Sequence, residues 1–195
     1  MTPSPVLREQ LRTLSSAQLV RAATRLRPGQ DLANPLAATK YAMREIAPRH
    51  QFLTDQLKRL DVELHTQVTA AAPTLLARHA VGIDTAGALL VTLGDNPGRL
   101  HSESSFAHLC GVAPLPASSG KTTGRHRLNR GGDRRANNAL WRIVLVRMGT
   151  DQRTRDYVAR RTAQGVSKPE IMRCLKRYVA REIYSALNAD PLDKQ

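Results

Sequence analysis

The stretch "SKPEIMRCLKRYVAREIYSALNAD" (residues 167–190) predicts one long amphipathic helix. Ser167 followed by Glu170 is typical of the capping box that starts a helix. Apolar residues then recur in steps of three and four, which places them on one helical face. That face consists of Ile171, Leu175, Tyr178, Val179, Ile183 and Leu187. A face of this kind is stable when other elements cover it, so the stretch predicts a helical core.

Most of the remaining chain carries helical signals as well. Asp133 is placed to cap a helix over residues 134–148. The expected buried side of that helix is Leu140, Trp141, Val144, Leu145 and Met148. Shorter helices are predicted around Leu75 and Leu76, between a cap at Asp84 or Thr85 and Gly94, and between a cap at Ser102 and Gly111. The strand candidates are short and lie near residues 112–115. The sequence therefore predicts a mainly α protein.

A second apolar stripe lies nearer the N-terminus, in the a/d spacing of a coiled coil over about three heptads. Its members are Met43, Ile46, His50, Leu53, Leu57, Leu60 and Leu64. Pro48 lies inside the pattern and should kink or restart the helix. Two alternatives stay open: the stripe packs within its own chain, or it pairs with other copies and makes a homo-oligomer. We expect a helical and coiled-coil segment over residues 1–72, a second domain over 73–188 and a flexible tail over 189–195.

The composition bounds the possible partners. The chain has 195 residues, a net charge of +14 and a sequence pI of about 11.0. Such a charge indicates a polyanionic partner, nucleic acid or an anionic membrane. No run approaches the roughly 18 apolar residues of a spanning helix, and the first residues lack the apolar core of a secretory signal. Cys110 and Cys174 are expected to be reduced thiols. These features favour nucleic acid as the partner, no membrane, and a cytoplasmic, nucleoid-associated protein.

One candidate phosphate contact lies in "PTLLARHAVGIDTAGALLVTLGD" (residues 73–95). A short helix, an apolar turn with Gly82 and a second helix are typical of a helix-hairpin-helix unit. The glycine of such a turn lets the backbone approach a phosphate. An ordinary helical hairpin is nearly as good an interpretation. Asp84 argues against the functional one, because its carboxylate would lie where a phosphate binds.

The most unusual stretch is "PASSGKTTGRHRLNRGGDRRANN" (residues 116–138). Its candidate nucleic-acid contacts are Lys121, Arg125, His126, Arg127, Arg130, Arg134 and Arg135. Because it lies between two segments with core patterns, a disordered tail is a poor interpretation. A basic loop before a helix N-terminus suits a phosphate. Ser118, Ser119 and Gly120 also give an exposed hydroxyl that could attack a phosphodiester, although such a turn is usually structural.

Three parts of the chain resemble the transposases of the insertion sequence 110 family (relatives 116 and 902). They are residues 35–64, residues 81–140 and "RTRDYVARRTAQGVSKPEIMRCLKRYVAREIY" (residues 153–184). The most specific part is "GVAPLPASSGKTTGRHRLNRGGDRRANNAL" (residues 111–140). The resemblance implies a C-terminal transposase domain preceded by a coiled-coil segment. It also implies a recombinase that is guided by a structured RNA and joins DNA through phosphoserine intermediates. The family's nucleophile is the serine immediately before a glycine in this loop, which is Ser119 here.

The same resemblance implies a further domain. Family members begin with a RuvC-like domain whose acidic tetrad holds magnesium, and the first residue of this chain falls about where that domain ends. We therefore expect a C-terminal half with no cofactor of its own, and Mg²⁺ only together with a RuvC-like domain. Two functions stay open: the catalytic half of a serine-type transposase, or a non-catalytic remnant that binds DNA or RNA. An in-frame RuvC-like segment upstream in the genome would favour the first.

Overall fold

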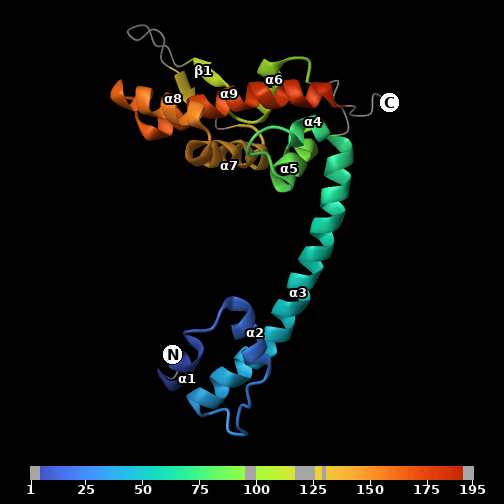
Figure 1. Ribbon diagram of the computed structural model, residues 1–195, viewed down its shortest axis with the longest axis vertical. Helices are drawn as coiled ribbons and strands as arrows, with labels where there is room; N and C mark the ends of the chain where they lie inside the picture. Colours follow the sequence, from blue (N-terminus) through green and yellow to red (C-terminus); the bar gives the residue numbers. More distant parts are fainter. Residues whose placement is uncertain (1–4, 95–99, 117–125, 129–130, 191–195) are drawn as a thin grey trace. The chain divides into compact units, whose positions relative to one another are not determined.

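The computed structural model of the protein describes residues 5–94, 100–116, 126–128 and 131–190, with the backbone alone at 116 and 126–128. Within these residues helices dominate and the strands are two short ones, which confirms the predicted mainly α class (Figure 1). The chain divides into two compact units, residues 1–63 and 64–195. The division falls inside helix α3 (Pro35–Ala71). The boundary expected at residue 72 stays a prediction.

Unit 1 contains α1 (Pro5–Leu11), α2 (Ser16–Thr24) and the first part of α3. Ser15 and Gln18 form a reciprocal capping box at the start of α2. The Asn34 side chain accepts a hydrogen bond from the Leu36 amide at 2.9 Å and so begins α3. The restart expected at Pro48 does not occur, because α3 continues through it. A proline removes one backbone donor, and the turns on both sides retain their own hydrogen bonds.

The apolar stripe of α3 lies open to solvent in this chain. Ile46 is 63% exposed, Leu57 60% and Leu60 64%. The buried residues in this part of α3 are instead Ala37 and Ala47. Unit 1 by itself therefore leaves these three side chains uncovered, and packing of the stripe elsewhere in its own chain stays one of the two alternatives. The intermolecular coiled coil stays a prediction.

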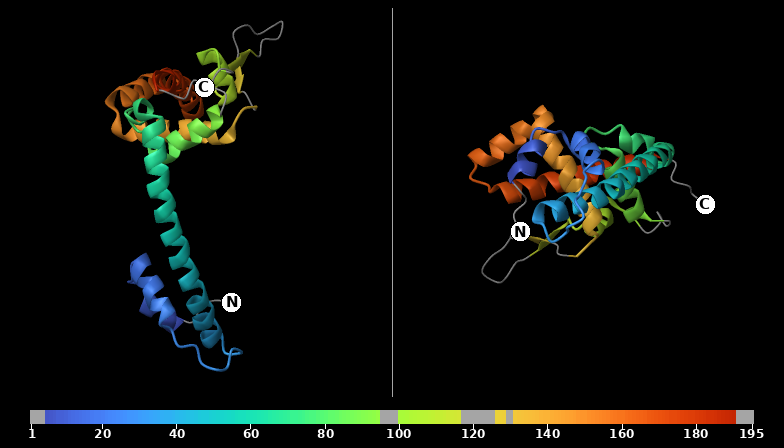
Figure 2. Two further views of the ribbon diagram at one scale, coloured as in Figure 1. Left: turned by 90° about the vertical axis from the view of Figure 1, so that its right-hand side faces the viewer. Right: turned by 90° about the horizontal axis from the view of Figure 1, so that it is seen from below.

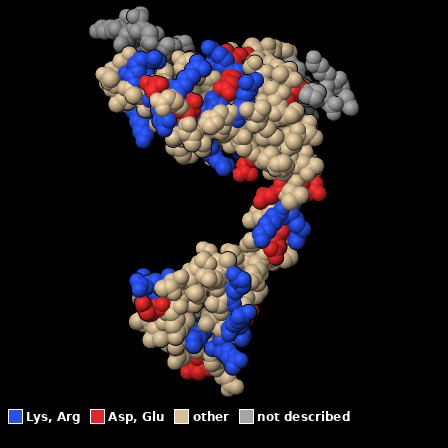
Figure 3. All heavy atoms as spheres, in the orientation of Figure 1, with Lys and Arg blue, Asp and Glu red and all other residues tan. Residues whose placement is uncertain are grey.

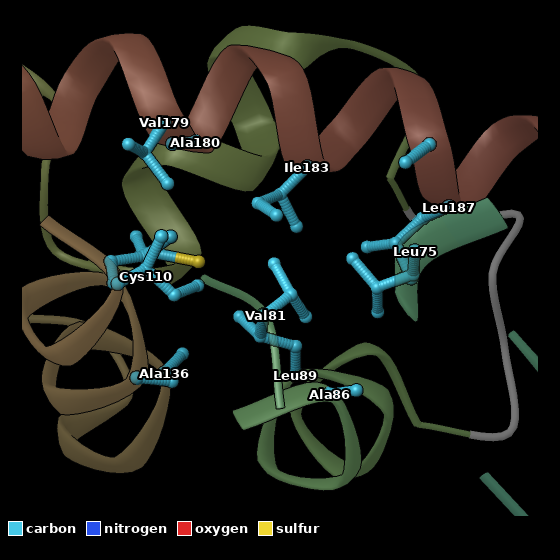
Figure 4. Close-up of a cluster of buried hydrophobic side chains, with 14 of the residues drawn as sticks. Leu75, Val81, Ala86, Leu89, Cys110, Ala136, Val179, Ala180, Ile183 and Leu187 are labelled. Atoms are coloured by element: carbon cyan, nitrogen blue, oxygen red, sulfur yellow. The ribbon is translucent and has the colours of Figure 1, made fainter. Parts of the chain in front are cut away.

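Unit 2 holds the other helices around a single apolar core. Its elements are α4 (Pro73–Leu76), α5 (Ile83–Leu93), α6 (Glu103–Leu109), β1 (Pro114–Pro116), β2 (His126–Leu128), α7 (Arg134–Thr150), α8 (Gln152–Ala163) and α9 (Lys168–Ala189). Helix α9 packs against α4, α6, α7 and α8. Figure 4 shows Ile183 and Leu187 of α9 pointing toward Leu75 of α4 and toward Val81 and Leu89. The predicted long helix is thus the element around which unit 2 is assembled.

Three side chains expected in the core are on the surface. Tyr178 is 54% exposed, Trp141 42% and Leu145 47%. The buried face of α7 is Ala136, Ala139, Leu140, Ile143 and Val144. Trp141 and Leu145 each follow a buried residue by one position, and one residue turns a helix by about 100°. The predicted buried face of α7 is therefore one position too wide.

The end of α9 is tied to the start of α4 by Asp190, a residue assigned to the tail in the sequence analysis. Its carboxylate accepts hydrogen bonds from the amides of Thr74 at 2.7 Å and Leu75 at 3.0 Å, and the residue is buried. These bonds satisfy two orphan donors of α4, whose own N-cap Ala72 has no polar side chain. Ser167 precedes α9 as expected, but its side chain makes no capping bond.

The exposed stripe leads to a first prediction. We expect the protein to be an oligomer whose assembly the double change Leu57→Asp with Leu60→Asp abolishes, because aligned chains would bring these charges into one apolar seam. Sedimentation measures the change in mass, and far-ultraviolet circular dichroism should show that the helices remain.

The control changes Lys58 and Arg59 to Asp, two exposed residues off the stripe, and should leave the oligomer intact. A wild-type chain that is monomeric at tens of micromolar would contradict the prediction.

Candidate nucleic-acid interface

The basic stretch is built partly as a β-hairpin. β1 pairs with β2 in antiparallel register, with Pro114 opposite Leu128 and Pro116 opposite His126. The two strands lie side by side at the edge of unit 2 (Figure 2). Residues 126–128, expected in a long loop, are therefore the second strand. The hairpin connection, residues 117–125, lies outside the described residues and contains Ser119, Lys121 and Arg125.

Two glycines close the base of this hairpin. Gly111 has φ 65° and Gly132 has φ 99°, a region that side chains disfavour. A Cβ on Gly132 would lie 2.6 Å from the Gly111 nitrogen, and one on Gly111 would lie 2.7 Å from the Gly131 oxygen. The Asp133 amide also donates to the Leu109 carbonyl at 2.6 Å. The chain therefore enters and leaves the hairpin through one tightly packed point.

Side chains reinforce this point from beneath. Asn137 Nδ2 donates to the Cys110 carbonyl at 2.9 Å and to the Gly111 carbonyl at 3.3 Å. Lys176 Nζ of α9 in turn donates to Asn137 Oδ1 at 2.9 Å. Lys176 is buried, and burial, with a smaller effect of Arg173, lowers the pKa of its ammonium group. Asn137 thus links the hairpin base to α9.

No sequence pattern predicts the contact between Asn137 and Lys176. They are separated by 39 positions, and each belongs to an ordinary helical pattern. A buried lysine is uncommon, but nothing local marks Lys176 as buried. Only the packing of α7 on α9 brings the two together.

Cys110 lies at the base of the hairpin, and its thiol is unreactive. Burial, followed by the nearby charge of Asp133, raises the pKa of its thiol to about 12. A thiol with this pKa is protonated at neutral pH and is a poor nucleophile. Cys110 is therefore not a candidate nucleophile.

The arginines of the stretch fall into two groups. Arg134 and Arg135 are exposed in the first turn of α7, and in the part of the chain that the structure describes neither side chain has a hydrogen bond or ion pair. Arg130 lies outside the described residues, and at His126 and Arg127 only the backbone is described. The Asp133 side chain accepts from the Ala136 amide at 2.8 Å, which confirms the expected cap. Because this carboxylate occupies the helix terminus, phosphate contacts would depend on the arginine side chains.

The turn at Gly82 differs from a helix-hairpin-helix in two respects. The Gly82 amide donates to Thr85 Oγ1 at 3.0 Å, so this donor is already paired. The residue in the left-handed region is Ala80, with φ 64°, whereas Gly82 has φ −99°. Asp84 faces Arg142 at 3.6 Å between the carboxylate and the guanidinium group. The assignment of Gly82 as a phosphate contact stays a prediction.

Neither a metal site nor a membrane-spanning helix is found in the described residues. No group of three or more His, Cys, Asp or Glu side chains in them could hold a metal ion. None of their helices has both the length and the apolar character needed to cross a bilayer.

The region that contains the hairpin is similar to a known protein family. Residues 72–159 match the model of the Transposase IS116/IS110/IS902 family. This segment is thus similar to a transposase-family domain. It contains the hairpin, its glycine closure, all of α7 and most of α8. The family resemblance expected from the sequence is therefore confirmed.

Two relatives come from insertion elements. The chain is 27% identical over 135 residues to the "Insertion element IS110 uncharacterized 43.6 kDa protein" of Streptomyces coelicolor, which covers 68% of the chain and 33% of that relative. It is 25% identical over 168 residues to the "Insertion element IS900 uncharacterized 42 kDa protein" of Mycobacterium paratuberculosis, which covers 84% of the chain and 40% of that relative. The match thus spans less than half the length of these two relatives.

The glycine geometry leads to a second prediction. Gly132→Ala should lower the free energy of unfolding by about 2–5 kcal/mol, because it adds strain at positive φ and a backbone clash. Gly82→Ala should change stability by at most about 1 kcal/mol in either direction. Its φ is ordinary and a Cβ would meet nothing within 4 Å, but Gly82 is the N-cap of α5, where alanine is less favourable. Urea denaturation measures both, and equal effects would contradict the described turn geometries. The affinity of folded Gly82→Ala protein for duplex DNA then tests the phosphate contact separately.

The transposase-family domain leads to a third prediction, on salt dependence. Changing Arg125, Arg127 and Arg130 together to Ala should reduce the slope of log K against log salt on duplex DNA by about 3, at about 0.9 per phosphate. The loss should be the same for unrelated DNA sequences, because phosphate contacts do not read bases. Fluorescence titration at several salt concentrations measures it. Changing Arg21, Arg25 and Arg27 of unit 1 is the matched control, and an unchanged slope in the hairpin variant would remove these arginines from the binding site.

Proposed function

We propose that this chain supplies the serine nucleophile and the phosphate-contacting arginines of a DNA transposase. The observation that carries the proposal is the family match over residues 72–159, which includes the hairpin connection with Ser119. The family resemblance assigns the nucleophile to the serine before the glycine, Ser119 followed by Gly120. DNA is the proposed substrate, and its cleavage and rejoining during transposition is the proposed reaction.

The chemistry follows from a serine attacking a phosphodiester. Ser119 Oγ would form a bond to phosphorus while the bond to one sugar oxygen breaks, and that oxygen leaves as a hydroxyl. Attack by a hydroxyl of another strand on the phosphoserine would then release Ser119 and join the strands. Each step exchanges one phosphate ester for another, so no external energy source is required. The hydroxyl has to lose its proton during attack, and His126, which is seven residues along from Ser119 and pairs with Pro116, is a candidate acceptor.

Positive charge would assist the same step. A pentacovalent phosphorus carries more negative charge on its oxygens than the starting diester, and guanidinium groups stabilise that charge. Arg125, Arg127 and Arg130 are the proposed contacts near the scissile phosphate, and Arg134 and Arg135 are exposed where α7 begins. Their role in the proposal is to hold the DNA backbone, not to read its bases.

The anchored hairpin base supports this assignment physically. A nucleophile reacts fast only if its position is restricted relative to the phosphate. Both ends of the connection are restrained at their roots by the strand pairing, and the base is held by the Asp133–Leu109 bond and the Asn137–Lys176 link. The residues on either side of the connection that contains Ser119 are therefore anchored to unit 2.

The proposed reaction also requires a metal ion and further macromolecules. The described residues do not form a magnesium site. The proposal assigns Mg²⁺ to a RuvC-like acidic domain. A structured guide RNA and further copies of the chain are the proposed partners.

The fourth prediction tests the nucleophile. Ser119→Ala should abolish covalent protein–DNA adducts, because the attacking oxygen is lost. The assay mixes the chain with labelled DNA, a guide RNA and a RuvC-like domain from a family member, and detects adducts after denaturation. Ser118→Ala is the matched control and should form adducts at the wild-type level.

Adducts that persist in the Ser119→Ala protein would overturn the assignment. A wild-type chain that binds DNA but forms no adduct under these conditions would instead support the non-catalytic alternative.

A further inference from the structure

A groove of about 1110 Å³ lies among α7, α8 and α9, away from the residues assigned so far. Val144, Leu175 and Val179 are buried and form its apolar floor. Arg153, Arg160 and Tyr178 line it and are exposed. The groove belongs entirely to unit 2.

Basic charge is in excess around this groove. Residues 152–189, which contain α8 and α9, hold nine Lys or Arg and three Asp or Glu residues. Figure 3 shows basic side chains over α8 and α9 with smaller acidic areas between them. A surface of this sign attracts a polyanion.

The acids that line the groove are already engaged. Glu182 accepts two bonds from the Arg147 guanidinium group, at 2.7 and 2.9 Å. That bond, together with the charges of Arg147, Arg78 and Arg153, lowers the pKa of Glu182 despite its burial. Asp151 caps α8 through the Thr154 amide and hydroxyl, and Asp156 accepts from Gln152. The groove is lined by five arginines and these three carboxylates, so positive charge remains in excess.

Two of the arginines in the groove are not paired directly with an acid of the described residues. Within the described part of the chain, the Arg153 and Arg160 side chains have neither a hydrogen bond nor an ion pair. Arg160 instead lies over the Tyr157 ring, with its central carbon 5.4 Å from the ring centroid. Stacking through the face of a guanidinium group leaves its N–H edge available for a phosphate.

The groove also offers an aromatic surface. Tyr157 and Tyr178 meet edge to face with centroids 5.8 Å apart. Arg160 covers one face of Tyr157, whereas Tyr178 is 54% exposed. An exposed aromatic ring beside unpaired arginines is the combination with which proteins bind unpaired nucleic acid, the ring stacking on a base and the cations holding the backbone.

We propose that this groove binds a single-stranded segment of nucleic acid, with a base on Tyr178 and neighbouring phosphates on Arg153 and Arg160. A duplex fits these features less well, because its bases are stacked on one another and cannot stack on a protein ring. The inference does not depend on Ser119 as nucleophile, since it concerns another surface and another event, binding without bond breakage. DNA and RNA share the chemistry that these residues recognise.

The test measures binding of the full chain to about 12-nucleotide oligodeoxythymidine and oligouridine, a length within the usual range of single-strand sites. Fluorescence anisotropy of labelled strands gives the affinity, with a blunt duplex as comparison. Tyr178→Ala should weaken binding to at least one of the two strands by about 5- to 100-fold, the cost of one lost stacking contact, and leave the duplex unaffected. The more affected strand identifies DNA or RNA as the ligand.

Two variants control for other effects of the change. Tyr178→Phe retains the ring and should bind like the wild type. Tyr41→Ala removes a tyrosine of unit 1 that is 42% exposed and also lies beside an arginine, Arg44, and it should bind like the wild type. The proposal is overturned if Tyr178→Ala binds both strands normally, if it loses duplex affinity equally, or if Tyr178→Phe loses as much.

A second variant keeps the test decisive should Tyr178→Ala fail to fold. Arg153→Ala with Arg160→Ala should reduce the salt slope on oligodeoxythymidine or oligouridine by about 1.4, at about 0.7 per phosphate on a single strand. Arg155→Ala is its control, because Arg155 lies on the same helix but donates to Gln152 and Gly149. An unchanged slope in the double variant would overturn the proposal.

Discussion

Unit 2 depends on one constraint, the burial of the apolar face of α9. Ile171, Ile183 and Leu187 are each at most 2% exposed, and α4, α6, α7 and α8 all pack against this helix. Burying a large aliphatic side chain is worth about 1.5–3 kcal/mol, so this face is a main source of stability for the unit. The opposite side of α9 carries arginines, and the same helix therefore organises the core and presents charge to solvent.

Buried polar groups then decide how the ends of this core are joined. Asp190 satisfies two amides of α4, and Lys176 reaches Asn137 beneath the hairpin. Burying an ammonium group is costly unless it is hydrogen-bonded, so apolar contacts alone would stabilise the core at lower cost. Such a link does specify which segments meet, and here it ties α9 to the base of the hairpin that carries the proposed nucleophile.

Two parts of unit 2 are the proposed sites of nucleic-acid binding. One is the hairpin with the first turn of α7, where the proposed contacts hold the phosphates of the reacting DNA. The other is the groove of α7, α8 and α9, where Tyr178 adds an aromatic face to the arginines. If both proposals hold, two surfaces of different chemistry would allow a paired and an unpaired segment to be bound at once.

The amino-acid sequence alone determined the helical class, the cap at Asp133 and the family resemblance, because each depends on residues close together in the chain. Periodicity also identified most of the buried face of α9. It misplaced Tyr178, Trp141 and Leu145, since the width of a buried face depends on which helices pack against it. It missed the strand at residues 126–128 because pairing with residues 114–116, rather than local propensity, makes that strand. Only the tertiary structure brought Lys176 to Asn137 and closed Gly111 on Gly132, because these contacts join residues 39 and 21 positions apart.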